Sequence, residues 1–257
     1  MERKDIGIAL MYLVFISGLV GILLHEPVSQ DNSYHSFSDQ RTMLNVPNFL
    51  NVISNIPFML VGAMGLYGTL VSKTLKIEPE LKSAYVMFFI GVVLISIGSG
   101  IYHLNPNNVT LVWDRIPMTI GFMALFSVVV GEYISVEKGK LILFPLIILG
   151  GMSVAYWHIT ETNGEGDLRP YILVQFLPMI LIPVIILFFR SKFSNTSGYW
   201  LLLLFYFLAK LFEHYDDTVY DVGAILSGHS LKHVFVAIGI LFLINSYKIR
   251  KKPDKDH

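Results

Sequence analysis

The chain has 257 residues, of which 54% are hydrophobic and only 15% are charged, and its mean hydropathy is +0.60. A soluble domain typically carries about 25% charged residues, so a water-soluble globular protein is excluded. The 19 basic and 19 acidic residues balance, which gives nucleic-acid binding no electrostatic support, and the absence of cysteine excludes disulfides, thiolate metal sites and a cysteine nucleophile. The composition predicts a polytopic membrane protein that does not bind nucleic acid.

Apolar segments close to 20 residues long, about the length that crosses a bilayer as a helix, recur along the chain. They predict eight spans, at residues 6–24, 49–71, 84–104, 111–134, 141–157, 169–189, 199–215 and 228–247. The first apolar run is too long for an ordinary signal peptide and no A-x-A site follows it, so we expect an uncleaved helix. The seventh is the weakest, because its apolar run stops before Lys210, Glu213 and His214.

The basic residues between these spans predict their direction. Fourteen of the 19 lysines and arginines fall on one alternating set of segments: Arg3, Lys4, Lys73, Lys76, Lys82, Lys138, Lys140, Arg190, Lys192, Lys248, Arg250, Lys251, Lys252 and Lys255. The positive-inside rule then predicts eight spans with both termini in the cytoplasm. The basic residues at 248–255 are expected to rest on anionic lipid at that face.

Few polar residues lie within the predicted spans, and five of them share one predicted depth. Ser99 and His103 lie one helical turn apart at the end of the third span, and Asp114 lies at the start of the fourth. His229 and His233 share one helical face at the start of the eighth. The predicted topology places all five near the extracytoplasmic face. Because polar groups inside a membrane are costly and usually face a cavity or a partner, this grouping indicates a functional site.

The residue types in this group favour a metal-dependent hydrolase. Three neutral imidazoles with an open fourth position are typical of catalytic zinc, and His103, His229 and His233 are the candidate ligands. Zinc would lower the pKa of a bound water to about 7; Asp114 could then accept or orient the water's proton, and Ser99 could donate to a substrate carbonyl. Taken singly, these residues are more typical of interfacial histidines, a helix cap and a small packing residue. Together they favour a metal site.

Other polar and aromatic residues have simpler interpretations. Aromatic-belt anchors are predicted at Tyr156, Trp157, Tyr199 and Trp200. Lys210 and Lys232 lie within predicted spans and are expected to extend toward the interface, although Lys232 could instead meet an acidic lipid head group or Asp114.

The stretches S-G-I-Y-H (99–103), D-R-I-P-M (114–118) and H-S-L-K-H (229–233) resemble the alkaline ceramidase family of integral membrane amide hydrolases. N-V-I-S-N (51–55) resembles the start of that family's first core helix, and the resemblance covers roughly residues 39–247. It implies an all-α membrane protein with a seven-helix core, to which the first predicted span adds one N-terminal helix. We therefore expect an N-terminal helix and loop at 1–30, the core at 31–247 and a basic cytoplasmic tail at 248–257.

The resemblance also implies roles for the five residues. His103, His229 and His233 would bind zinc, Asp114 would activate water, and Ser99 would stabilise the oxyanion. The implied substrate is a ceramide-like N-acyl lipid, whose amide bond is cleaved to give a fatty acid and a sphingoid-type amine. The spacing of the residues alone does not distinguish an amide from an ester.

The segment before the first core helix departs from the family pattern. Eukaryotic relatives carry an acid-rich calcium site there, but here the segment reads S-D-Q-R-T-M-L-N-V-P-N (38–48), with Asn48 at the expected glutamate position. Only Asp39 is acidic and Arg41 lies beside it, so calcium binding is not expected. Residues 39–41 could instead cover the outer mouth of the site through hydrogen bonds.

Two other classes of function stay open at the level of sequence. One is a seven-helix lipid receptor or binding protein of the progestin/adiponectin-receptor kind, which has a similar His/Asp zinc pattern. The other is a transporter, although transporters carry broken helices and charged residues at mid-membrane, whereas the polar residues here lie near one face. For the leading hypothesis, a hydrolase, we expect a membrane-embedded monomer that acts on a lipid substrate.

Overall fold

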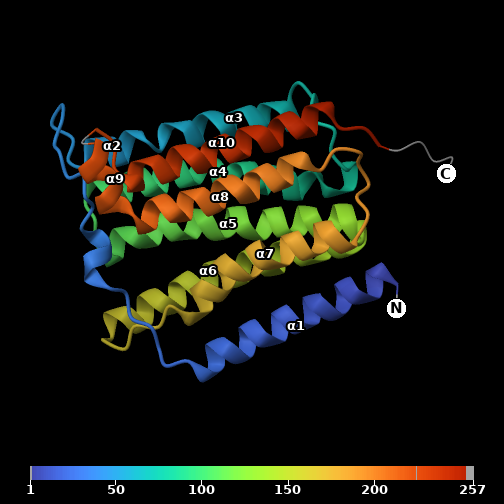
Figure 1. Cartoon of the computed structure of the whole chain (residues 1–257), viewed down its shortest axis with the longest axis horizontal. Helices are drawn as coiled ribbons and strands as arrows, with labels where there is room; N and C mark the ends of the chain where they lie inside the picture. Colours follow the sequence, from blue (N-terminus) through green and yellow to red (C-terminus); the bar gives the residue numbers. More distant parts are fainter. Residues whose placement is uncertain (1, 224, 253–257) are drawn as a thin grey trace.

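The computed structural model describes residues 2–223 and 225–252, and within these ranges the regular structure is helical, with no β-strand. Figure 1 shows long helices running side by side along one direction. The long helices are α1 (Arg3–Leu24), α3 (Ile56–Leu70), α4 (Lys82–Leu104), α5 (Asn108–Tyr133), α6 (Val136–Thr162), α7 (Arg169–Phe188), α8 (Ser197–His214) and α10 (Gly228–Ile249). The short elements are η1 (Asn32–His35), α2 (Phe49–Ile53), η2 (Pro79–Leu81) and α9 (Asp216–Gly223). The prediction of an all-α membrane bundle is confirmed.

Seven segments of the described chain are long and apolar enough to cross a membrane, and they include α1 and the combined segment Phe49–Leu70. The predicted second span is interrupted, because α2 ends at Ile53 and α3 begins at Ile56. The seventh predicted span, α8, is not among the seven segments. It nevertheless packs along α10 within the bundle (Figure 1), so its membrane crossing stays a prediction.

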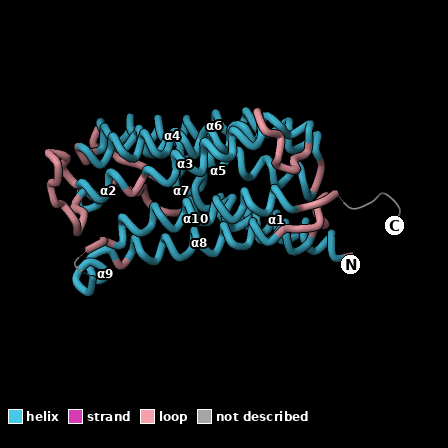
Figure 2. Tube along the Cα trace, turned by 90° about the horizontal axis from the view of Figure 1, so that it is seen from above, coloured by secondary structure: helices cyan, strands magenta, loops and turns pink. Residues whose placement is uncertain are grey.

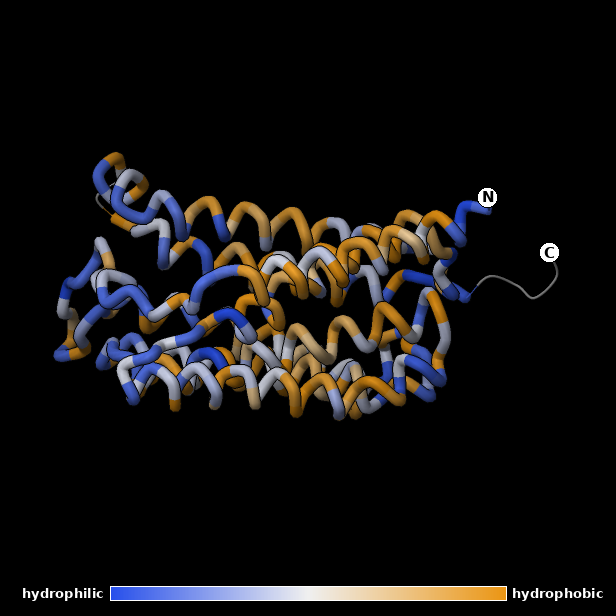
Figure 3. Tube along the Cα trace, turned by 90° about the horizontal axis from the view of Figure 1, so that it is seen from below, coloured by the Kyte–Doolittle hydropathy of each residue, from blue (hydrophilic) through white to orange (hydrophobic). Residues whose placement is uncertain are grey.

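The arrangement of the helices places both ends of the described chain at one end of the bundle (Figure 1). Helix α4 packs between α3 and α5, α5 also contacts α6 and α7, and α10 contacts α8 and α3 (Figure 2). Figure 3 shows hydrophobic residues along the long helices and hydrophilic residues in the loops that join them. This is the distribution expected when the helix surfaces face lipid.

Helix α1 lies at the edge of the bundle and packs mainly on α7. A Cβ atom added to Gly7 would lie 2.5 Å from Cβ of Phe188, so the glycine permits this close approach. Most other side chains of α1 are exposed and apolar, for example Leu13, Leu23 and Leu24. Helix α1 is therefore a peripheral addition to the bundle.

Small residues bring α4 and α5 together near the predicted site. A Cβ atom added to Gly98 would lie 1.9 Å from the carbonyl oxygen of Trp113, and one added to Gly91 would lie 2.8 Å from the backbone nitrogen of Gly121. Helix α5 begins after a short turn, where Asn107 accepts hydrogen bonds from the backbone nitrogens of Val109 and Thr110. This close packing sets the end of α4, with Ser99, against the start of α5, with Asp114.

Two of the four predicted aromatic anchors are wrong. Trp157 is fully buried and its Nε1 donates to Oε2 of Glu161 at 3.2 Å. Tyr199 is 2% exposed and its hydroxyl donates to Oε2 of Glu132 at 2.8 Å. An aromatic residue near the end of a span carries the same local signal whether it faces the interface or the interior, and only the helix packing distinguishes the two.

Candidate metal centre and active site

The three predicted zinc ligands converge in the interior of the bundle. His103 lies at the end of α4, and His229 and His233 lie in the first two turns of α10. Their exposed fractions are 1%, 5% and 6%, and one ring nitrogen from each lies within 4.8 Å of the others. The structure therefore brings together side chains from segments more than 120 residues apart in the sequence.

The spacing of these nitrogens fits a metal ion. Nε2 of His103 lies 3.3 Å from Nε2 of His229, and two imidazoles bound to one tetrahedral zinc are separated by about 3.3 Å for bonds of about 2.0–2.1 Å. Nδ1 of His103 is buried and has no hydrogen-bond partner among the described residues. A set of three imidazoles with no thiolate suits zinc, copper, iron or nickel, and zinc is the most common hydrolytic choice.

The candidate ligands make hydrogen bonds with Ser54, Asn48 and Asp216, and the sequence did not predict these contacts. Oγ of Ser54 lies 2.8 Å from Nδ1 of His233, and Nδ2 of Asn48 donates to the backbone oxygen of His103 at 2.9 Å. The backbone nitrogen of His229 donates to Oδ1 of Asp216 at 2.6 Å. Ser54 belongs to the N-V-I-S-N motif, so the motif was a signal for this contact although the pairing was not predictable from it.

The loop between α1 and α2 covers the histidines. The ring of Phe37 lies 4.7 Å from that of His103 and 4.5 Å from that of His229, measured between centroids, and Phe37 is 3% exposed. On the next residue, the backbone nitrogen of Ser38 donates to Oδ2 of Asp216 at 3.1 Å. Asp216 therefore joins the covering loop to the backbone of His229, a candidate metal ligand. Phe37 was not predicted, because a phenylalanine in a polar loop carries no signal for such a role.

Asp39 lies in this loop and is paired with a base. Its carboxylate accepts hydrogen bonds from Nε and Nη2 of Arg41, each at 2.8 Å, and its backbone oxygen accepts one from Nδ2 of Asn51 at 2.9 Å. The hydrogen bonds from Arg41 lower the pKa of Asp39, while burial of the carboxyl opposes this shift. Nη2 of Arg41 also donates to the backbone oxygen of Ile225 at 2.7 Å. Residues 39–41 thus tie the covering loop to α2 and to the segment before α10.

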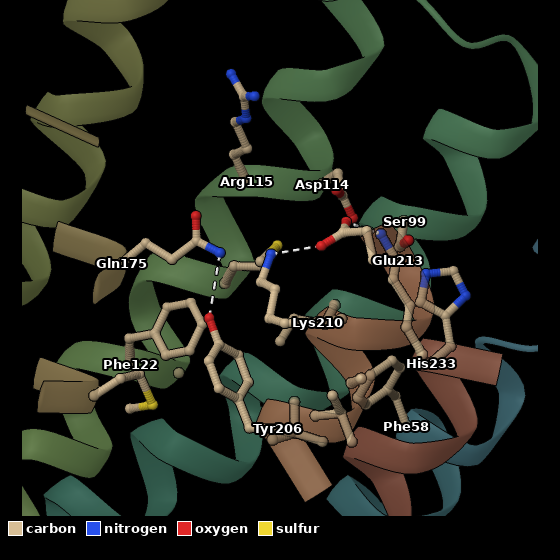
Figure 4. Close-up of a pocket in the computed structure, with 18 of the residues that line it drawn as sticks. Phe58, Ser99, Asp114, Arg115, Phe122, Gln175, Tyr206, Lys210, Glu213 and His233 are labelled. Atoms are coloured by element: carbon tan, nitrogen blue, oxygen red, sulfur yellow. Dashed lines mark hydrogen bonds and ion pairs between the residues drawn. The ribbon is translucent and has the colours of Figure 1, made fainter. Parts of the chain in front are cut away.

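The other two predicted site residues line a cavity that reaches His233. Ser99, Asp114 and His233 border this cavity of about 250 Å³, and Figure 4 shows the Ser99 side chain beside the Asp114 carboxylate. Much of the remaining wall is apolar and comes from α3, α4, α5, α7, α8 and α10, with residues such as Phe58, Phe88, Met118, Phe122, Met179 and Val236. Such a cavity suits an acyl chain with its polar end directed toward Ser99 and Asp114.

Charged residues also line this cavity. Nζ of Lys210 and Nζ of Lys232 each donate to Glu213, at 2.6 Å (Figure 4 shows the pair with Lys210). The lysines therefore pair with a buried carboxylate, and the possible partnership of Lys232 with Asp114 does not occur. Arg115 follows Asp114 in the chain and borders the same cavity.

We compared the chain with known proteins and protein families. None of the curated proteins matches the chain. Residues 41–255 match the family model described as Ceramidase, a range that includes α2 to α10 and leaves α1 outside. The matched range contains the three histidines, Ser99 and Asp114, and it agrees with the resemblance found in the motifs. The chain belongs to the ceramidase family.

Proposed function

We propose that the protein is a zinc-dependent intramembrane hydrolase that cleaves the amide bond of ceramide-like N-acyl lipids, releasing a fatty acid and a sphingoid-type amine. The observation that carries the proposal is the convergence of His103, His229 and His233 beside a largely apolar cavity lined by Ser99 and Asp114, in a chain of the ceramidase family. The cavity wall supplies the lipid-binding surface, and the histidines supply a site for the metal.

The residues divide the chemistry among them. When bound to the histidines, zinc would polarise the amide carbonyl and lower the pKa of a water molecule. Asp114 takes the proton from the attacking water and passes it to the nitrogen as the carbon–nitrogen bond breaks. The Ser99 hydroxyl donates to the carbonyl oxygen as negative charge develops there. One water is consumed, and the products are a carboxylic acid and an amine.

The proposal includes an orientation and a domain organisation. The basic residues at one end of the bundle support cytoplasmic termini, which puts the histidines near the extracytoplasmic face. The core extends over residues 31–247, with an added helix in residues 1–30 and a basic tail at 248–257. We propose that a monomer suffices, because all five site residues come from one chain.

A lipid hydrolysis screen tests the proposal. Purified wild type, His103→Ala and His25→Ala are incubated with a total lipid extract, and the products are followed by mass spectrometry. His25→Ala is a matched control because His25 is exposed and lies outside the metal cluster. We expect wild type and His25→Ala to release a fatty acid with an equimolar amine, and His103→Ala to release neither. Tight lipid binding without any hydrolysis by wild type would favour the receptor class and reject the enzyme.

A further inference from the structure

The charges that line the cavity do not balance. Arg115, Lys210 and Lys232 contribute three positive charges, whereas Asp114 and Glu213 contribute two negative ones. The rest of the wall is largely apolar, and an uncompensated charge in such surroundings costs free energy. A ligand that brings one or more negative charges would restore the balance.

Two of these cations share one carboxylate. Oε2 of Glu213 accepts a hydrogen bond from Lys210 and Oε1 of Glu213 accepts one from Lys232, each at 2.6 Å. The side chains of Glu213 and Lys232 are 18% and 16% exposed, so solvent screens their charges weakly. This cluster keeps a net positive charge after the internal pairing, and its lysines retain N–H donors for a further acceptor.

The third cation has no internal counter-ion among the described residues. Arg115 is 6% exposed, and its guanidinium lies 4.1 Å from the ring centroid of Trp157 and 4.8 Å from that of Tyr171. Nη2 donates to Oε1 of Gln30, a neutral amide, while the buried Nη1 has no hydrogen-bond partner within the described chain. A guanidinium packed against aromatic rings, with an N–H that has no partner among the described residues, is well suited to a carboxylate or a phosphate.

Tyr34 connects Arg115 to the lysine–glutamate cluster. The guanidinium of Arg115 lies 6.0 Å from the centroid of the Tyr34 ring, and the Tyr34 hydroxyl lies 3.5 Å from Oε1 of Glu213. All three cations border the cavity. In Figure 4 the Lys210 ammonium lies beside Glu213, whereas the Arg115 side chain leaves α5 next to Asp114 and its guanidinium points away from Lys210. Lys232 directly precedes His233, which places this charged region next to the metal-binding histidines.

We propose that Arg115, Lys210, Lys232 and Tyr34 form a head-group subsite for an N-acyl lipid whose head group carries a phosphate or a carboxylate. The acyl chain would occupy the apolar part of the cavity, and the anion would compensate the excess positive charge. Hydrolysis of this lipid rests on the function proposed above, but its recognition does not.

A binding measurement tests recognition of the anionic head group separately from hydrolysis of the lipid. The probes are three non-hydrolysable ketone analogues of N-acyl lipids with one acyl chain, in which a methylene replaces the amide nitrogen: one neutral, one with a phosphate and one with a carboxylate. Their affinities are measured for the purified full chain in lipid nanodiscs. We expect at least one anionic probe to bind about tenfold or more tightly than the neutral one, as charge-assisted hydrogen bonds would provide. The two anionic probes show which head group is preferred.

Variants that remove either a positive or a negative charge from the cavity make the binding test specific. Lys232→Gln and Lys210→Gln should each bring the anionic-to-neutral affinity ratio toward one, whereas Glu213→Gln should raise it. Lys140→Gln is the control, because Lys140 is exposed and lies outside the cavity. A purely structural role would shift the affinities for all three probes together.

The subsite would be overturned if wild type bound the three probes equally. It would also be overturned if the anionic-to-neutral affinity ratio moved in the same direction in the lysine and glutamate variants. Hydrolysis of neutral lipids alone would leave the enzyme proposal standing.

Discussion

Oγ of Ser54 lies 2.8 Å from Nδ1 of His233 and 3.0 Å from the backbone oxygen of Asn51. Because the Asn51 carbonyl can only accept, we infer that the Ser54 hydroxyl donates to it and that the Ser54 oxygen accepts the hydrogen of Nδ1 on His233. In that tautomer Nε2 is unprotonated, which is the state that binds a metal. Ser54 lies in the break between α2 and α3, which places its hydroxyl beside this candidate ligand.

Loss of this hydrogen bond should weaken metal binding. Ser54→Ala removes the acceptor for Nδ1, and we expect zinc affinity to fall by about 10–100-fold, the usual effect of losing such a partner. Competition with a chromogenic chelator measures the change. Ser127→Ala is the matched control, since its buried hydroxyl donates to the backbone oxygen of Gly139 away from the histidines. An unchanged affinity in Ser54→Ala would show that Ser54 does not orient the ligand.

The cover provided by Phe37 should protect the metal centre. Phe37→Ala removes a buried ring from the faces of His103 and His229, and a truncation of this kind costs about 3–5 kcal/mol. We expect faster extraction of zinc by a chelator as well as lower stability, because water would reach the histidines. Phe37→Leu should keep most of the protection. Extraction at the wild-type rate from the alanine variant would contradict a covering role.

The pairing of Asp39 with Arg41 predicts a pH dependence. Hydrogen bonds from Arg41 lower the pKa of Asp39 in the folded protein, whereas an unfolded aspartate titrates at about 3.9. The stabilising contribution is therefore complete above pH 4 or so and is lost as the pH falls through the lower, folded-state pKa.

Asp39→Asn should accordingly lower the thermal midpoint at pH 7, and its difference from wild type should shrink as the pH falls below about 4. Thermal unfolding in detergent across this range measures the difference. Asp221→Asn serves as the control, because Asp221 is exposed in α9. A difference between Asp39→Asn and wild type that stays constant with pH would contradict the ion pair as its cause.

The prediction that the basic residues at 248–255 rest on anionic lipid is wrong for Arg250, which is 1% exposed and forms a buried ion pair with Glu132 at the opposite end of the bundle. This pair should matter for stability and not for the metal. Nη2 of Arg250 lies 2.7 Å from Oε1 of Glu132, both side chains are at most 1% exposed, and the hydroxyls of Tyr85 and Tyr199 donate to the same carboxylate. Arg250→Ala leaves Glu132 without its counter-ion, which costs about 3–5 kcal/mol.

Chemical unfolding should show this loss, while zinc content stays at the wild-type level. The exposed pair of Lys140 and Glu80 gives the comparison, because Lys140→Ala should change stability by no more than about 1 kcal/mol. Equal effects of the two substitutions would show that Arg250 contributes little.

The sequence predicted the long helices because their signals are local. Apolar runs of membrane length marked each span, and the alternation of basic loops ordered them. The break at residues 54–55 was missed because two polar residues, Ser54 and Asn55, do not by themselves end an otherwise apolar span, and α9 was missed because its acidic residues are typical of a loop. Lys210 and Glu213 are one turn apart, so their pairing had a local basis, whereas the pairing of Lys232 depends on how α8 meets α10.

The sequence predicted the part of the candidate site whose residues lie at the same predicted depth in the membrane. The histidine triad follows from helix ends that the topology placed together, and the described structure brings the three rings into one group. Phe37, Ser54 and Asp216 were not predictable, because each makes a contact with a segment distant in sequence, which for Asp216 is the backbone nitrogen of Ser38. The charge imbalance of the cavity also emerges only when Arg115 and the two lysines line one space.

The central claim is that the histidine triad holds a zinc ion on which hydrolysis of an N-acyl lipid depends. Fatty acid release from an N-acyl sphingoid lipid by purified protein, before chelation, after chelation and after zinc is returned, tests it most directly. We predict activity in the first and third states, none in the second, and none in any state for His229→Ala. Release that continues at the same rate after complete removal of metal, or in His229→Ala, would contradict the account.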